Sequence, residues 1–272
     1  MRFFLNKASY LGEKYKYFID MLASDENTTS DEVISIICIP GTWDSWEDFT
    51  QSISTATNGA YSFEGDILIN SMDERFYTIE FFEAQEDLDE SFRYAGMVTG
   101  VSEDFLEEVG NQSHVIFISG VTGNMEEAWH LALAAKAILD AGGIGIRIET
   151  AGKAFEKEYW NELIENFKPL NLYLMFVVDT ILDEDGSVYT CGMHNIGYKD
   201  TIMSGEKFEE AATLIYNFAY YQIHNNTTIQ NGGVFSTGLS SPKFRIIDEP
   251  NQPYQGDEMF ENDFGMWRLS RL

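Results

Sequence analysis

Residues 114–143 read HVIFISGVTGNMEEAWHLALAAKAILDAGG and place a strand signal directly before the clearest helix signal of the chain. The run 114–120 is short, apolar and rich in β-branched residues, which predicts a strand buried on both faces. Beyond the turn that follows, small and apolar residues recur at spacings of three and four, and this pattern predicts a helix over 125–141. The recurring residues are Ala128, Leu131, Ala132, Ala135, Ile138 and Leu139. The pair Gly142-Gly143 ends the helix.

Strand and helix signals alternate on the N-terminal side of this block. The β-branched run 33–39 predicts another buried strand, and Asp44 is expected to cap a helix that extends to about residue 57. The segments YSFEGDILIN (61–70) and RFYTIEFFE (75–83) predict the two strands of a hairpin. One or two polar helices are expected after it, so that the element order up to residue 120 is βαββαβ. The polar helical stretch covers residues 87–109.

The same order of elements is predicted on the C-terminal side of the central helix. Strands and helices again follow in the order βαββαβ. The expected elements are a strand at 144–149, a helix at 155–167, strands at 170–181 and 187–192, a helix at 205–223 and a strand at 243–247. Segment 225–242, rich in Asn, Thr, Gly and Ser, is predicted to be a long loop, and residues 249–263 an irregular acidic segment.

The element orders predict an α+β fold with antiparallel or mixed sheets and helices on one face. The repeated order favours two ferredoxin-like βαββαβ halves packed as one unit. Residues 1–123 would form an acidic N-terminal half, and residues 124–272 a C-terminal half that includes the long loop 225–242. This repeat is an inference from element order, because the two halves show no convincing residue-level identity.

The C-terminal half carries a resemblance to a known family. The block from Glu126 to Leu163, with Gly142-Gly143, Ala151-Gly152-Lys153-Ala154 and Trp160, resembles the bacterial domain of unknown function numbered 4261. The stretch 189–194, YTCGMH, is similar to the C-terminal part of that family. The resemblance implies a bacterial cytoplasmic protein of α+β fold, and it implies no activity. Relatives of this general kind resemble members of the immunity neighbourhoods of bacterial toxin systems.

Charge is the outstanding property of the composition. The 272 residues include 45 Asp and Glu but only 17 Lys and Arg, which gives a formal net charge of -28. Such a surface repels phosphate backbones and anionic headgroups, so neither nucleic-acid nor membrane binding is expected. No window of about 20 residues is free of charge, and no signal-peptide core precedes residue 20. Two cysteines in apolar surroundings fit a reducing compartment, and we expect a cytoplasmic protein.

No strong catalytic, cofactor or metal motif occurs in the sequence. The turn 119–124 precedes a helix, where phosphates can bind, but it lacks the Gly-Lys-Ser/Thr ending of a P-loop and leads into two glutamates. Cys191 and His194 have the spacing of half a zinc site, and no second pair completes it. We therefore expect neither a cofactor nor a metal ion.

Acidic residues concentrate in the first 110 positions, which hold 23 acidic and 6 basic residues. Two clusters stand out, and aromatic residues are interleaved with them. The candidate protein-binding residues are Trp43, Trp46, Glu83, Glu86, Asp87, Asp89, Glu90, Glu103, Asp104, Glu107 and Glu108. One interpretation is that the carboxylates only form the solvated faces of polar helices. The other is that they present an acidic and aromatic surface to a basic protein.

Three functions remain open at this stage. The first is a non-enzymatic acidic binding module, an immunity protein that neutralises a basic toxin. The second is an enzyme that acts on a small cationic or neutral substrate through carboxylates such as Glu149 or Asp179 at strand ends. The third is a housekeeping domain whose charge keeps it soluble. The sequence predicts no oligomeric state.

Overall fold

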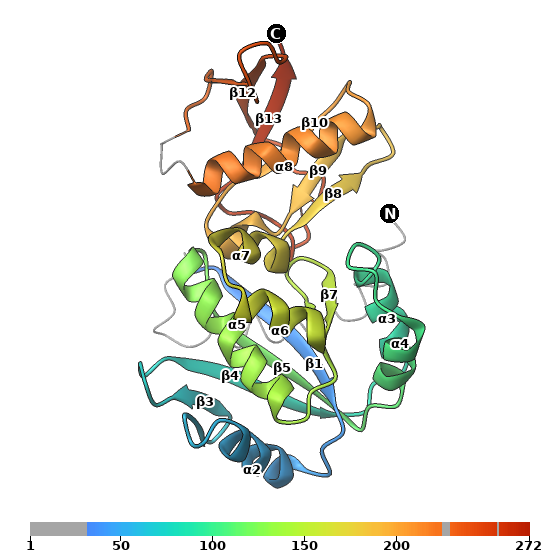
Figure 1. The fold of residues 1–272 in the computed structure, drawn as a ribbon, viewed down its shortest axis with the longest axis vertical. Helices are drawn as coiled ribbons and strands as arrows, with labels where there is room; N and C mark the ends of the chain where they lie inside the picture. Colours follow the sequence, from blue (N-terminus) through green and yellow to red (C-terminus); the bar gives the residue numbers. More distant parts are fainter. Residues whose placement is uncertain (1–31, 225–228, 255) are drawn as a thin grey trace.

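The computed structural model describes residues 32–224, 229–254 and 256–272, which form an α+β fold with two sheets (Figure 1). The α+β class expected from the sequence is confirmed. The described helices are α2 (Trp46–Ala56), α3 (Leu88–Ala95), α4 (Glu103–Gly110), α5 (Met125–Asp140), α6 (Lys157–Glu165), α7 (Pro169–Phe176), α8 (Phe208–His224) and the short 3-10 helix η1 (Met193–Ile196). None of the helices in these ranges has the length and hydropathy that a membrane span requires.

The large sheet has seven strands, and every neighbouring pair in it is antiparallel. Its spatial order is β2-β3-β4-β5-β1-β6-β7. The strands are β1 (Ile34–Gly41), β2 (Tyr61–Glu64), β3 (Ile67–Asn70), β4 (Phe76–Glu83), β5 (His114–Val121), β6 (Gly145–Ile148) and β7 (Lys153–Glu156). The predicted buried strands 33–39 and 114–120 are β1 and β5, which pair with each other near the middle of the sheet.

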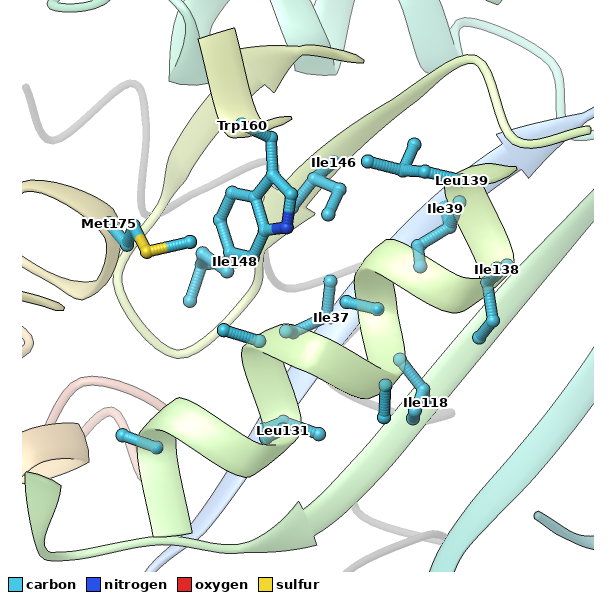
Figure 2. Close-up of a cluster of buried hydrophobic side chains, with 14 of the residues drawn as sticks. Ile37, Ile39, Ile118, Leu131, Ile138, Leu139, Ile146, Ile148, Trp160 and Met175 are labelled. Atoms are coloured by element: carbon cyan, nitrogen blue, oxygen red, sulfur yellow. The ribbon is translucent and has the colours of Figure 1, made fainter. Parts of the chain in front are cut away.

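Side chains of β1 alternate between the two faces of the large sheet. Ile37 and Ile39 pack under α5 on what we call the helix face (Figure 2). Side chains of α2 and α6 belong to the same buried cluster. Cys38 points to the opposite side, which we call the outer face, where it packs against α3 and α4. Both sides of β1 are buried, which explains why its sequence is a continuous apolar run rather than an alternating one.

Helix α5 forms where the spacing of small and apolar residues predicts it. The Asn124 side chain accepts a hydrogen bond from the Glu127 amide at 2.9 Å and so caps the first turn. Glu126 and Glu127 in that turn complement the helix dipole. The helix ends at Asp140, with Ala141 as its C-cap, and Gly142 follows with a φ of +116°.

The small sheet has six strands in the order β11-β12-β13-β10-β9-β8. Its strands are β8 (Val178–Leu182), β9 (Val188–Cys191), β10 (Asp200–Met203), β11 (Val234–Phe235), β12 (Phe244–Glu249) and β13 (Met266–Arg271). β10 and β13 run parallel, and the other pairs are antiparallel. Helix α8 packs on one face through Ile215 and Phe218. The acidic segment after β12 covers the other face through Tyr254 and Phe260.

The loop around η1 joins the small sheet to the large one. The buried Asn195 side chain accepts hydrogen bonds from Ser35 of β1 at 2.5 Å and from Thr150 at 2.8 Å. Its amide nitrogen donates to the Gly192 carbonyl at 2.9 Å. Gly197 closes the loop with a φ of +85°, and a Cβ atom there would lie 2.4 Å from the Gly123 carbonyl oxygen. The two sheets therefore meet through a contact that leaves no room for a side chain.

Strand pairing does not follow the expected division at residues 123 and 124. β6 and β7 lie in the expected C-terminal half, but β6 pairs with β1 and completes the large sheet. The remaining strands of that half form the small sheet, which contains a parallel pair. The two ferredoxin-like halves are not confirmed, since one sheet draws strands from both of them.

Several element predictions need correction. The expected strand 170–181 is helix α7 followed by β8, because a short apolar run does not distinguish a buried helix from a strand. Segment 61–70 is two strands, with Gly65 at a φ of +66° in the turn between them. Ser45 rather than Asp44 caps α2. The predicted helix 155–167 begins two residues later, because 153–156 is β7.

We expect Gly197→Ala to destabilise the protein more than Gly186→Ala. Both glycines have a positive φ, at +85° and +82°, so alanine incurs a left-handed strain of about 1–2 kcal/mol at either position. Gly186 has open space around it, whereas the new Cβ at Gly197 meets the Gly123 carbonyl. This overpacking lowers the free energy of unfolding of Gly197→Ala by about 1–3 kcal/mol more. Urea unfolding of both variants measures the difference, and equal losses would show that the junction is loosely packed.

Candidate functional site

Six of the nine predicted carboxylates lie on α3 and α4, two short helices that pack against each other on the outer face of the large sheet, and Glu83, Glu86 and Asp87 precede α3. Phe92 of α3 and Phe105 of α4 are buried there and meet edge to face, with 5.9 Å between ring centroids. The Ser102 side chain caps α4 by accepting from the Phe105 amide. Thr99, in the connection between the helices, donates to the Ala154 carbonyl of β7 at 2.6 Å. The helix pair is thereby fixed to the sheet.

The apolar sides of α3 and α4 face the sheet, and their carboxylates face outward. Of the nine predicted carboxylates, Asp89 is half-buried and the other eight are exposed. The exposed ones are Glu83, Glu86, Asp87, Glu90, Glu103, Asp104, Glu107 and Glu108. Arg93 is the one cation among residues 83–110, and its ion pair with Glu103 lowers the pKa of that carboxyl. We call these nine carboxylates the acidic surface.

Exposed apolar side chains adjoin the acidic surface at the connection between α3 and α4. Met97 is 71% exposed and Val98 is 50% exposed. Tyr94, on the last turn of α3, is 48% exposed. Sequence analysis did not single out Met97 or Val98. Their position between Gly96 and Gly100 is the signal that places them on a turn rather than in the core.

The predicted tryptophans do not belong to the acidic surface. Trp43 is 2% exposed, packs against Phe49 and donates its indole N–H to the Ala141 carbonyl at 2.7 Å. Trp46 is half-buried and packs against Phe49, Phe63 and Phe81. Both lie on the helix face, on the opposite side of the sheet from α3 and α4. Their large apolar surfaces stabilise the core. The prediction that Trp43 and Trp46 belong to the protein-binding surface is therefore corrected.

The glycine-containing turn 119–124 is filled by another part of the chain. The Gly123 amide donates to the Asn195 carbonyl at 3.1 Å, and the Thr122 amide donates to the Val33 carbonyl at 2.7 Å. Asn124 caps α5. Amides that already donate within the protein are not available to a phosphate, so the interpretation of this turn as a plain loop agrees with its contacts.

Cys191 and His194 are buried side chains in the small-sheet region. Burial raises the pKa of the Cys191 thiol well above its ordinary value and lowers the pKa of His194 to about 4. A buried neutral thiol is a poor nucleophile. Within the described ranges, no group of three or more His, Cys, Asp or Glu side chains is placed to hold a metal ion.

The carboxylates considered for catalysis have other partners. Glu149 is buried and accepts from the Arg147 guanidinium at 2.6 Å. Burial lowers the pKa of the Lys153 ammonium to about 8. The negative charge of Asp179, which is half-buried, opposes this shift. Lys153 donates to the Leu174 and Val177 carbonyls, at 2.6 and 2.8 Å, at the end of α7. Lys153 therefore stabilises a helix end.

Asp200 is the most unusual buried carboxyl, and sequence analysis did not identify it. It has no exposed surface. Thr190 and the Met193 amide donate to Oδ1, while Tyr254 and Asn262 donate to Oδ2 at 2.8 and 2.7 Å. These bonds fasten the acidic segment after β12 to the small sheet. The hydrogen-bond partners of Asp200 are spread over 72 positions of the sequence, so no short sequence pattern indicates them.

A shallow pocket of about 230 Å³ lies near the junction of the two sheets. It is lined by Gly197, Tyr198, Lys199, Gln222, Ile229, Phe264 and Trp267. Lys199 lies over the Trp267 ring, 4.2 Å from its centroid, and forms an ion pair with Asp248. No carboxylate lines this pocket, so it does not bring Glu149, Asp179 or Asp200 to a bound molecule.

No family model, curated protein or solved structure matches the chain. The resemblance to the bacterial domain of unknown function therefore stays a prediction.

The burial of Asp200 predicts a pH dependence of stability that Asp200→Asn removes. Burial raises its pKa to about 6, against 3.8 in an unfolded chain, although four hydrogen bonds oppose the shift. Between pH 3.8 and about 6 the folded protein binds a proton at Asp200 that the unfolded chain does not bind. Asp200 therefore adds to the free energy of unfolding as the pH falls below about 6, and this contribution is lost as the pH rises through about 6. The difference corresponds to about 3 kcal/mol.

Urea unfolding of both proteins between pH 4 and 7 tests this prediction. We expect the free energy of unfolding of the wild type, minus that of D200N, to increase toward low pH. His194 and the surface carboxylates titrate in both proteins, so their effects cancel in this difference. A difference that stays constant across the range would contradict the assignment of this pKa.

Proposed function

We propose that this chain is a non-enzymatic protein-binding module, an immunity protein that neutralises a basic toxin in the bacterial cytoplasm. The observation that supports the proposal is the acidic surface, where eight exposed carboxylates and a single arginine lie on α3, on α4 and on the segment from the end of β4 to α3. Like charges that are held close together repel each other, and a cationic partner relieves that repulsion. A nucleic acid is anionic and would increase it.

The neighbouring apolar side chains add what a charged surface alone lacks. Exposed charges mainly raise the association rate, whereas desolvated apolar contacts hold a complex together. Met97 and Val98 are exposed at the end of the helix pair and provide such contacts. The partner that fits is therefore a protein with a lysine- or arginine-rich surface beside an apolar depression.

The two other functions gain less support from the geometry. Glu149 is bound by Arg147, Asp179 acts electrostatically on Lys153, and no carboxylate lines the described pocket. A housekeeping domain would have no need of a concentrated charge. Acidic residues serve solubility equally well when spread over the surface.

The double variant Glu107→Lys and Glu108→Lys tests the acidic surface. Both residues are exposed in the last turn of α4, where a positive charge favours the helix dipole, so the fold should tolerate them. The matched control is Glu162→Lys with Glu165→Lys, which changes the net charge equally in the last turn of α6 on the opposite face of the sheet.

Surface plasmon resonance against the basic proteins encoded next to this gene measures the effect. We expect E107K/E108K to lower the association rate by about 10-fold or more at low salt, and the control to change it much less. Equal effects of the two variants would mean that only net charge matters. Absence of binding by every basic neighbour at micromolar concentration would refute the proposal.

Met97→Asp with Val98→Asp separates the apolar contribution from the charge. These substitutions add two negative charges, so charge alone would speed association with a basic partner. If Met97 and Val98 lie in the interface, the dissociation rate should instead rise by about 10-fold or more, because the loss of each buried side chain costs about 1–2 kcal/mol. An unchanged dissociation rate places the apolar residues outside the interface.

A further inference from the structure

The pocket near Trp267 has no part in the proposed function. It lies between the last turn of α8, which carries Gln222, and the beginnings of β10 and β13, where Lys199 and Trp267 are placed. None of its described lining residues is acidic, although the chain contains 45 Asp and Glu. Lys199 is the one charged residue of the lining. The pocket therefore favours a neutral or anionic molecule over a cation.

Two contacts hold the Lys199 ammonium at the wall of the pocket. Its Nζ lies 4.2 Å from the centroid of the Trp267 ring and forms an ion pair with Asp248. Asp248 itself does not line the pocket, and its side chain is 55% exposed. An ion pair with so much exposure to water contributes little free energy. An anion in the pocket can therefore replace Asp248 as the partner of the ammonium.

Gln222 supplies a second hydrogen-bond donor to the same part of the pocket. Gln222 is 7% exposed, and its Nε2 donates to the Lys199 carbonyl at 3.3 Å. A side-chain amide nitrogen carries two N–H groups, so one remains for a bound molecule. A carboxylate has two oxygens that accept hydrogen bonds. It can accept from the Lys199 ammonium and from Gln222 together.

The other side chains of the lining are apolar or aromatic. Trp267 is 8% exposed and Phe264 is 39% exposed, and Tyr198 and Ile229 are partly buried. Aromatic walls favour a planar ring that packs against them edge to face or with an offset. A cavity of about 150 Å³ holds a benzene molecule, so about 230 Å³ has room for one ring with a short substituent.

We propose that this pocket binds a small aromatic carboxylate, with its carboxylate on Lys199 and Gln222 and its ring against Phe264 and Trp267. The net charge of -28 repels anions at long range, and this repulsion grows with the charge of the ligand, which favours a monoanion over a phosphorylated molecule. Salt screens distant carboxylates beyond about 8 Å, whereas Lys199 lies in the pocket itself. The proposal does not depend on the acidic surface.

A series of three small molecules tests the proposal on the full-length protein. The probe is benzoate, acetate lacks the ring, and benzylamine has the ring with the opposite charge. Calorimetry measures each Kd. Nuclear magnetic resonance of the indole N–H groups locates the binding, because the chain has five tryptophans and Trp267→Phe identifies the signal of Trp267.

We expect benzoate to bind with a Kd of about 1 mM or lower and to shift the Trp267 signal. Acetate and benzylamine should bind about 10-fold more weakly or not at all. Benzylamine that binds as tightly as benzoate would overturn the proposal, and so would benzoate that leaves the Trp267 signal in place.

The variant Lys199→Met tests the ammonium directly. Methionine keeps an apolar chain near the Trp267 ring and removes the charge, so the affinity for benzoate should fall by about 10-fold or more. The matched control is Lys207→Met, which changes the net charge equally at an exposed position before α8, at the opposite end of that helix from Gln222. Equal affinities of the two variants would contradict the role of Lys199.

The variant Asp248→Asn should have the opposite effect. It removes the carboxylate that competes for Lys199, so benzoate should bind about 2- to 5-fold more tightly. Asp248 is exposed, and the fold should tolerate the change even if Lys199→Met does not fold. The control is Glu162→Gln, which changes the net charge equally on α6 and should leave the affinity nearly the same. An affinity of D248N at or below that of E162Q would overturn the proposed carboxylate position.

Discussion

The arrangement of the two sheets depends on one buried side-chain amide, that of Asn195. An amide without access to water must find partners inside the protein, and Asn195 finds them on β1, on the turn after β6 and in its own loop. The Asn195 backbone carbonyl in addition accepts from the Gly123 amide, which joins η1 to the turn before α5. The same loop places the Met193 amide on Asp200, and its Gly197 lines the pocket near Trp267.

Local signals made most of the large sheet predictable. The apolar runs 33–39 and 114–120 and the small-residue helix 125–141 appear where expected, because each is strongly periodic or continuously apolar. Predictions failed where the structure of a segment depends on contacts with residues far away in the sequence. The run after Pro169 has no period that separates helix from strand, and pairing of β6 with β1 joins segments about 110 positions apart. The exposed carboxylates were predictable from composition, whereas the burial of Trp43 depends on contacts with α5.

Burial and exposure divide the titrating groups into two kinds. The surface carboxylates on and before α3 and on α4 concentrate negative charge on one part of the surface. Asp200 and His194 are buried a few residues apart and respond oppositely, since burial raises the pKa of the acid and lowers that of the imidazole. Their effects on stability therefore have opposite signs in mildly acidic solution.

The position of β13 between β10 and β12 has a consequence for synthesis. Translation is vectorial, and this central strand is synthesised after both strands that it joins. Until residues 266–271 leave the ribosome, β10 and β12 present unpaired edges that can capture other chains. The large sheet, complete by residue 156, can form well before that moment. The nascent protein therefore passes through a stage in which the large sheet is complete and the small sheet still has unpaired, aggregation-prone strand edges.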